Sequence, residues 1–155
     1  MKETILELNQ LKKYYGKQRG IESISCKIQK GDIYGLIGPN GAGKSTTIRT
    51  IMGLINKTSG TIYLKGKEIE IDNPENKKKI GYLPSEINLY EDMTVKELFD
   101  YHESFYQINC TKKRNELTSL FKIDESKKIE DLSLGNLKKV GIVLAFMHDP
   151  ELLIL

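Results

Sequence analysis

A run of small residues around a single lysine carries the clearest chemistry in this sequence. It reads Gly38-Pro39-Asn40-Gly41-Ala42-Gly43-Lys44-Ser45 and matches the pattern G-x-x-x-x-G-K-[S/T]. Glycines permit a backbone that turns several amide N–H groups toward one point, as phosphate oxygens require. Lys44 adds a positive charge for the β- and γ-phosphates, and the Ser45 hydroxyl is suited to ligate Mg²⁺. The run therefore predicts a site for a nucleoside phosphate.

The segments on either side of this loop are those that such a site needs. The run 33–37 before it is mainly apolar, which predicts a strand covered on both faces. After it, apolar residues at i, i+3, i+4 and i+7 predict an amphipathic helix: Ile48, Ile51, Met52 and Ile55. The free amides and the dipole of that helix would face the anion. The loop alone does not choose among GTPases, kinases and ATPases. The guanine-selecting pattern N-K-x-D is not matched, because the run 56–59 ends in serine.

The rest of the N-terminal half is typical of β-structure. Thr4–Leu8 and Ile24–Ile28 predict short strands. Thr61–Leu64 and Glu68–Ile71 predict a hairpin joined through the run 65–67. A further strand is expected at Ile80–Leu83, and it ends at Pro84.

From about residue 88 to residue 148 the pattern is helical. Thr94 and Glu97 fit a capping box, in which each side chain satisfies a free amide of the other residue. Three sets of apolar positions mark three helices: Val95, Leu98, His102 and Phe105; Leu117, Leu120 and Phe121; Leu137, Val140 and Leu144. Asp149-Pro150 ends the last helix. Leu152–Leu155 is expected to open another buried strand.

Length and composition describe one globular domain of 155 residues, with 39% hydrophobic and 29% charged residues. The net charge of +3, from 24 basic and 21 acidic residues, does not indicate nucleic acid as a partner. The clusters 77–79 and 112–114 are expected to be solvated faces. No apolar run reaches the ~20 residues of a membrane span, and no signal peptide is evident, which indicates the cytoplasm. Cys26 is expected to face a core, Cys110 receives no role, and neither His102 nor His148 is assigned a metal.

Taken together, these features resemble the ATP-binding domain of ABC transporters over essentially all 155 residues. The run 38–46 is similar to the family's phosphate loop. Tyr15 lies where the family places an aromatic ring that stacks on adenine, although Tyr14 or Tyr15 covering a sheet edge is the alternative. The resemblance implies an α/β fold: a RecA-like P-loop NTPase core with an N-terminal antiparallel β patch and an inserted helical subdomain. The core would comprise residues 1–86 and 132–155, and the helical subdomain residues 87–131.

Two further segments resemble family motifs with departures. The run 132–136 is similar to the signature Leu-Ser-Gly-Gly-Gln, of which Ser133 and Gly135 are retained. The family uses these residues on the ATP of the opposite subunit, whereas an ordinary helix N-cap is the alternative for Ser133. The run 80–86 resembles the segment that leads into the helical subdomain. Ser85 stands where the family has a glutamine that approaches Mg²⁺, and whether Glu86 replaces that glutamine stays open.

The last seven residues resemble the approach to the family's second phosphate-site motif. The aspartate and glutamate that follow in the family, and its switch histidine, are not among these 155 residues. We therefore assign no catalytic residue. The chain is expected to be truncated before that motif, to bind ATP, and to hydrolyse it poorly. Ser45, and less directly Ser85, are the expected Mg²⁺ ligands.

The resemblance also implies partners and a place in the cell. It implies a head-to-tail dimer with a second ATP-binding domain, a membrane-embedded permease, no nucleic acid, and a cytoplasmic position at the membrane. Two other functions stay open: a soluble ABC protein that acts on ribosomes, and a non-catalytic nucleotide-binding remnant. The transported substrate, and whether it is imported or exported, cannot be derived from the sequence.

Overall fold

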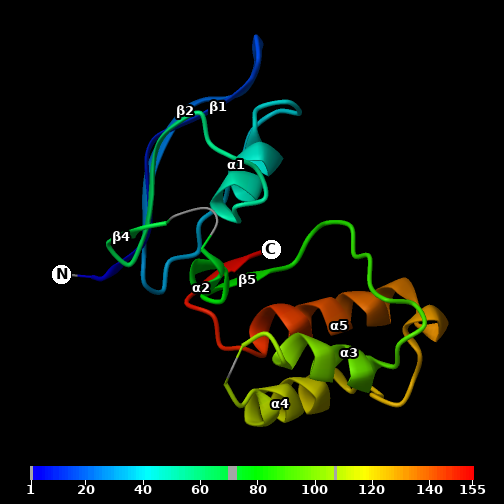
Figure 1. The fold of residues 1–155 in the computed structure, drawn as a ribbon. Coiled ribbons are helices and arrows are strands. Elements are labelled where there is room, and N and C mark those ends of the chain that lie inside the picture. Colours follow the sequence, from blue (N-terminus) through cyan, green and yellow to red (C-terminus); the bar gives the residue numbers. More distant parts are fainter. Residues whose placement is uncertain (1, 70–72, 107) are drawn as a thin grey trace. The chain divides into compact units, whose positions relative to one another are not determined.

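The computed structural model describes residues 2–69, 73–106 and 108–155, and it divides into two compact units (Figure 1). The first unit comprises residues 1–77 and the second residues 78–155. Each unit has its own elements and is described by itself.

An antiparallel sheet forms the body of the first unit, with the strand order β2-β1-β3-β4. The strands are β1 (Thr4–Tyr15), β2 (Gln18–Gln29), β3 (Ser59–Leu64) and β4 (Lys67–Glu68). The expected antiparallel patch is confirmed, and β1 and β2 are longer than the predicted strands. The β3–β4 hairpin is confirmed as well, with Lys65 and Gly66 at positive φ in its turn. The predicted strand Glu68–Ile71 continues outside the described residues.

The helix α1 (Lys44–Ile51) starts within the glycine-rich loop and is shorter than its apolar stripe predicts. Thr47, Thr50 and Ile51 are its buried residues. The chain leaves the helix at Gly53, whose φ of 66° few side chains tolerate, and the amide of Leu54 closes the end on the carbonyl of Arg49 at 2.8 Å. Ile55 therefore follows the helix instead of extending its stripe. The short helix α2 (Pro74–Lys77) ends the unit.

The predicted strand at residues 33–37 is wrong for the structure as described. No strand is assigned there, and both Ile33 and Ile37 are almost fully exposed. An apolar run marks a segment that can be buried, but a strand forms only where a neighbour supplies the ladder hydrogen bonds. No described strand pairs with this segment. Its Tyr34 hydroxyl contacts the half-buried Cys26 on β2, and burial raises the pKa of that thiol.

The second unit pairs two short strands in parallel, β5 (Ile80–Tyr82) and β6 (Leu152–Ile154). This confirms the strand expected near the end of the sequence, although its side chains are only half-buried. Gly81 lies opposite Leu153, and a Cβ at Gly81 would stand 2.1 Å from the carbonyl oxygen of Ala145. The close approach of β5 to the end of the helix α5 (Leu134–Phe146) thus requires glycine.

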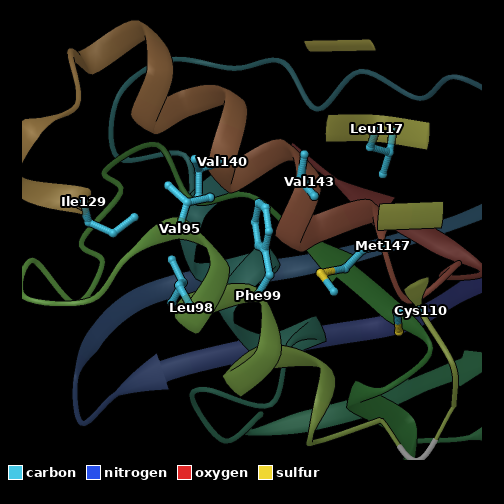
Figure 2. Close-up of a cluster of buried hydrophobic side chains, with 9 residues drawn as sticks. All are labelled: Val95, Leu98, Phe99, Cys110, Leu117, Ile129, Val140, Val143 and Met147. Carbon is cyan, nitrogen blue, oxygen red and sulfur yellow. The ribbon is translucent and has the colours of Figure 1, made fainter. Parts of the chain in front are cut away.

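Three helices form the core of this unit: α3 (Val95–Glu103), α4 (Thr111–Phe121) and α5 (Leu134–Phe146). A 3₁₀ turn, η1 (Ile129–Asp131), precedes α5. Figure 2 shows the buried cluster between them: Val95, Leu98, Phe99, Cys110, Leu117, Ile129, Val140, Val143 and Met147. The capping box of Thr94 and Glu97 is confirmed at the start of α3. Two apolar positions of the predicted stripes are exposed: Phe105, because α3 ends at Glu103 before reaching it, and Leu120, which lies in α4 but does not face the core.

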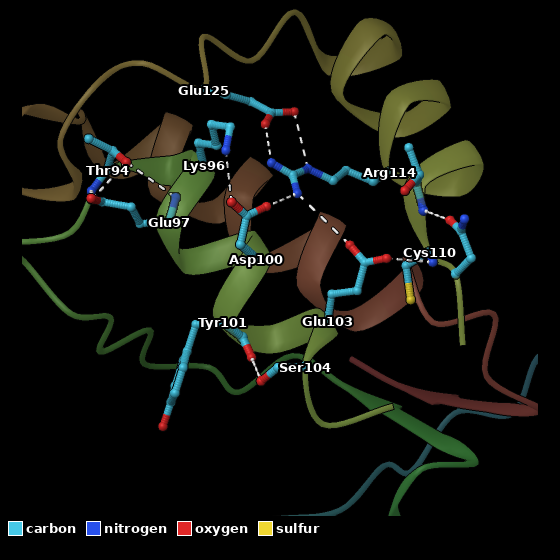
Figure 3. A network of polar contacts seen from close by, with 12 residues as sticks. Thr94, Lys96, Glu97, Asp100, Tyr101, Glu103, Ser104, Cys110, Arg114 and Glu125 are labelled. Atoms are coloured by element: carbon cyan, nitrogen blue, oxygen red, sulfur yellow. Dashed lines mark hydrogen bonds and ion pairs between the residues drawn. The ribbon is translucent and has the colours of Figure 1, made fainter. Parts of the chain in front are cut away.

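The prediction that residues 112–114 form a solvated face is wrong for Arg114. Arg114 is buried, and its guanidinium binds Glu125 through both acceptor oxygens and Asp100 at 2.5 Å (Figure 3). Glu103 lies 4.0 Å from the same guanidinium and also accepts the amide of Cys110. Arg114 therefore links α4 to α3 and to the loop that follows α4.

None of the helices in the described part of the chain is long and apolar enough to cross a membrane.

Candidate nucleotide-binding site

A cavity of about 500 Å³ in the first unit gathers the end of the β1–β2 hairpin and the start of α1. It falls in the size range of sites for small ligands. Its lining joins two groups of residues that are far apart in the sequence: Tyr15, Gln18, Arg19 and Gly20 from the hairpin, and Asn40, Gly41, Gly43, Lys44, Ser45 and Thr46 from the loop and helix.

The loop has the backbone that phosphate binding requires. Gly41 and Gly43 have φ values of 80° and 87°, in the left-handed region that favours glycine. Gly43 is the N-cap of α1, so the first amides of the helix point out of its end into the loop. The Lys44 ammonium donates to the carbonyls of Gly38 at 2.6 Å and Pro39 at 2.8 Å. These contacts fold the Lys44 side chain back onto the first two residues of the loop.

Tyr15 ends β1 and forms one wall of the cavity. Tyr15 is about half-exposed, and the ammonium of Lys13 lies 4.8 Å from its ring centroid, within cation–π range. Tyr14 is not among the lining residues, and its amide donates to the Thr58 hydroxyl at 2.9 Å. Of the two candidate rings, only Tyr15 thus shares a cavity with the loop.

Most of the predicted cofactor residues meet in this cavity. Gly38 is not among its lining residues and contributes through its carbonyl, which Lys44 occupies. Sequence reasoning missed three lining residues, Gln18, Arg19 and Gly20, which the hairpin brings to the loop. One local signal was present: a lone glycine in a strand pattern often marks a close approach of backbone. Gly20 is such a residue, but nothing local to Gln18 or Arg19 indicates the loop.

The other predicted site residues belong to the second unit. Ser133 is the N-cap of α5, and its hydroxyl accepts the amide of Asn136 at 3.4 Å. Gly135 follows in the first turn, where a Cβ would meet no atom within 4 Å. Ser85 and Glu86 lie just after β5, and both are exposed. The roles of these residues toward a nucleotide stay predictions.

Two observations bear on whether this site suits a magnesium nucleotide. Ser45 lines the cavity and is exposed, so its hydroxyl is accessible to a cation. Its neighbours in the cavity include the basic Lys44 and Arg19, which suit the negative charge of a triphosphate. The donor set therefore fits Mg²⁺ that arrives with its phosphates rather than a cation bound by the protein alone.

A glycine-rich loop that opens a helix, with a basic residue at its centre, defines a P-loop nucleotide-binding protein. The chain also matches the ABC transporter family over residues 21–155. It therefore belongs to that family, and it has the α/β fold of the family's ATP-binding domains, as the resemblance implied.

Individual relatives agree with this assignment. The chain is 38% identical to the linearmycin resistance ATP-binding protein LnrL of Bacillus subtilis (strain 168), over 97% of its own length and 50% of that protein. It is 36% identical to the bacitracin transport ATP-binding protein BcrA of Bacillus licheniformis, over 98% of its own length and 50% of that protein. A solved ATP-binding subunit of an ABC transporter superposes with a TM-score of 0.89 at 30% identity, covering 96% of this chain and 64% of that one. The chain thus spans about half the length of the curated relatives it matches.

Proposed function

We propose that this chain is the nucleotide-binding part of an ABC transporter ATPase subunit and binds ATP with Mg²⁺ in the cavity between Tyr15 and Lys44. The observation that carries the proposal is the position of the Tyr15 ring and the phosphate loop on one cavity. The loop amides and Lys44 would hold the β- and γ-phosphates, and Tyr15 would stack on the adenine. Ser45 would ligate the Mg²⁺, which neutralises phosphate charge when bound.

Family membership also supports a proposal for the wider assembly. Two such subunits would bind head to tail, so that Ser133 and Gly135 approach the ATP of the partner subunit. The subunit would act at the cytoplasmic side of a membrane through a permease, and ATP binding and hydrolysis would drive transport. Within the subunit, residues 1–86 and 132–155 would form the core and residues 87–131 the helical subdomain.

These 155 residues are expected to turn ATP over slowly. Attack on the γ-phosphate needs a group that orients water, together with charge compensation around the metal. None of the described residues that line the cavity is an aspartate or a glutamate. Phosphate release should therefore stay near background, far below the ~1 per second or more of typical enzymes.

Calorimetric titration with ATP and Mg²⁺ tests the binding proposal, with Lys44→Ala beside Lys27→Ala. Hydrogen bonds to a charged group contribute about 1.5–3 kcal/mol, so Lys44→Ala should weaken binding by about tenfold or more. Lys27 is an exposed lysine of β2 that pairs with Glu7, away from the cavity lining, and its variant should bind as the parent does. Equal affinity in all three proteins would refute the site. Phosphate release that is fast and abolished by Lys44→Ala would refute slow turnover.

A further inference from the structure

The β1–β2 hairpin is irregular where it reaches the cavity. Lys13 pairs with Ile21, and the next residue, Tyr14, pairs with Arg19. β2 therefore advances by two residues while β1 advances by one, and Gly20 is the extra residue. Such a bulge bends its strand and re-aims the side chains beside it, and bulges are frequent next to functional sites. The pair that follows is Tyr15 with Gln18, so the bulge directly precedes the predicted base-stacking ring.

Gly20 is also the point where three parts of the site come together. A Cβ at this position would stand 2.9 Å from Cε2 of the Tyr15 ring, 3.2 Å from the Thr46 methyl group and 3.1 Å from the Lys13 carbonyl oxygen. On the loop side, a Cβ at Gly43 would stand only 2.3 Å from the Gly20 carbonyl oxygen. The backbone of Gly20 thus touches the loop, and its missing side chain leaves room for the ring.

We propose that Gly20 is a positioning residue of the nucleotide site, which sets the place of the Tyr15 ring relative to the phosphate loop. The inference rests on the proposed function, since it assumes that Tyr15 stacks on the base. Any side chain at Gly20 would have to displace the ring, because the ring is the nearest mobile group, whereas the Lys13 carbonyl is part of the backbone. The ring would then leave the distance from the loop at which one nucleotide reaches both.

The proposal separates two parts of the affinity. Phosphate contacts come from the loop and the start of α1, where a new Cβ meets only the Thr46 methyl group at 3.2 Å, a contact that a shift of a few tenths of an ångström relieves. Base stacking depends on the ring. Gly20→Val should therefore raise the Kd for ATP by about tenfold, a loss typical of one base–aromatic contact. The Kd for inorganic tripolyphosphate, which has no base, should change by less than about twofold, within the scatter expected of a variant that leaves the loop unchanged.

The test compares Gly20→Ala, Gly20→Val, Tyr15→Ala and the double variant Tyr15→Ala with Gly20→Val, each titrated with ATP and with tripolyphosphate in Mg²⁺. Ser23→Val is the matched control, because it places the same new side chain at an exposed position of the same strand. A melting scan of each protein establishes that it is folded. Gly20→Ala serves as the smaller change if Gly20→Val does not fold. In the Tyr15→Ala background, Gly20→Val should have no further effect on ATP binding, since the ring it displaces is already absent.

A spectroscopic signal tests the position of the ring directly. The chain has no tryptophan, so Tyr15→Trp introduces a single indole. Its emission should be quenched by acrylamide more strongly after Gly20→Val than before, as the ring is displaced toward solvent. Unchanged quenching would overturn the proposal.

The possible titration results decide between the two proposals. If Tyr15→Ala weakens ATP binding and both Gly20 variants do not, the inference about Gly20 is wrong and base stacking stands. If neither Tyr15→Ala nor the Gly20 variants affect ATP binding, Tyr15 does not stack on the base, and the proposed role of Gly20 is refuted as well. If Gly20→Val weakens ATP and tripolyphosphate equally, Gly20 acts on the loop instead of the ring, and the inference is overturned.

Discussion

Two histidines lie close together in the second unit, at the ends of two helices. His102 belongs to the last turn of α3, and His148 follows α5. The His148 ring stacks on Tyr106 with 4.1 Å between the ring centroids, and the His102 ring lies 5.9 Å from His148. Burial lowers the pKa of His102 to about 4, and repulsion from His148 lowers it too, whereas the backbone of Leu144 opposes the shift. Burial likewise lowers the pKa of His148, against the opposing effects of the Ile80 and Leu144 backbones and of Asp149.

This arrangement predicts a loss of stability in mild acid. The folded pKa of His102 is about 4 against 6.5 for the ordinary group, so between these values the unfolded chain binds more protons. The contribution of His102 to the free energy of unfolding should therefore be fully present above pH 6.5. It should be lost as the pH drops toward 4, which lowers the free energy of unfolding by on the order of 3 kcal/mol. Urea unfolding at several pH values measures the loss.

His102→Leu should flatten that part of the curve, because leucine fills the site without a proton to bind. Tyr101→Leu, an exposed change on the same helix, should keep the acid dependence of the parent. Glu97 and Asp100 have lowered pKa values through hydrogen bonds from Thr94 and from Arg114, so their contributions are lost only at lower pH. Parallel curves for His102→Leu and the parent would disprove the assignment.

Individual residues could be predicted where the chemistry is local. The phosphate loop and the Thr94 cap can be recognised from the local sequence, since each depends on a few neighbouring residues in the chain. The contacts of Gly20 and Arg114 could not be predicted in this way. The Tyr15 ring and the phosphate loop contact Gly20 only after separate segments have folded together. The same is true of the carboxylates of Asp100 and Glu125 that bind Arg114. A basic cluster is solvated on average, and no local feature tells Arg114 from its neighbour Lys113.

The helices α3 and α4 depend on Arg114 for much of their polar contact. Its guanidinium donates to Asp100 of α3 and to Glu125 of the loop after α4. It also lies 4.0 Å from the Glu103 carboxylate of α3 and 5.2 Å from the Phe99 ring centroid. The arginine is buried, whereas side-chain exposure of its partners ranges from 23% for Glu103 to 48% for Asp100. Water therefore screens part of the attraction, but removal of the cation would leave three carboxylates close together.

Arg114→Met is expected to lower the free energy of unfolding by about 2–3 kcal/mol, less than for a fully buried pair because the carboxylates are partly solvated. Arg114→Lys keeps the charge but loses the paired contact with Glu125, so it should be intermediate. Urea unfolding of both variants measures this order. Lys113→Met is the matched control: it removes the adjacent, more exposed cation of the Glu116 pair and should change stability by less than about 1 kcal/mol. Equal effects at the two positions would contradict the network.

Among the elements, those specified by local rules could be predicted and those specified by partners could not. The hairpin turn at Lys65 and Gly66, the capped start of α3 and the short β6 all follow from turn, capping or apolar patterns. The run 33–37 has an equally clear apolar pattern, yet it forms no strand in the described structure. The apolar pattern of a sequence indicates which side chains tend to be buried. A strand, however, forms only where a neighbouring strand supplies backbone hydrogen bonds.

The site and the helical core belong to different compact units of the molecule. All residues that line the cavity lie in residues 1–77, and the buried cluster of α3, α4 and α5 lies in residues 78–155. Each unit therefore has its own set of contacts that stabilise its fold. A ligand adds stability only to the structure that must unfold before the ligand is released. Nucleotide binding should thus stabilise β1, β2 and α1 of the first unit and leave α3 and α4 of the second as they were.

Hydrogen exchange with and without ATP tests this division. At 100 times its Kd, ATP adds about 2.7 kcal/mol, which slows exchange through unfolding of the binding unit by about 100-fold. We expect this slowing for the protected amides of β1, β2 and α1, and none for those of α3 and α4. At the same ATP concentration, Lys44→Ala should reduce the slowing in the first unit by about tenfold or more, in line with its weaker binding. If ATP slows exchange equally in α3 and α4, the two units unfold as one, and the independence inferred from their separate cores is wrong.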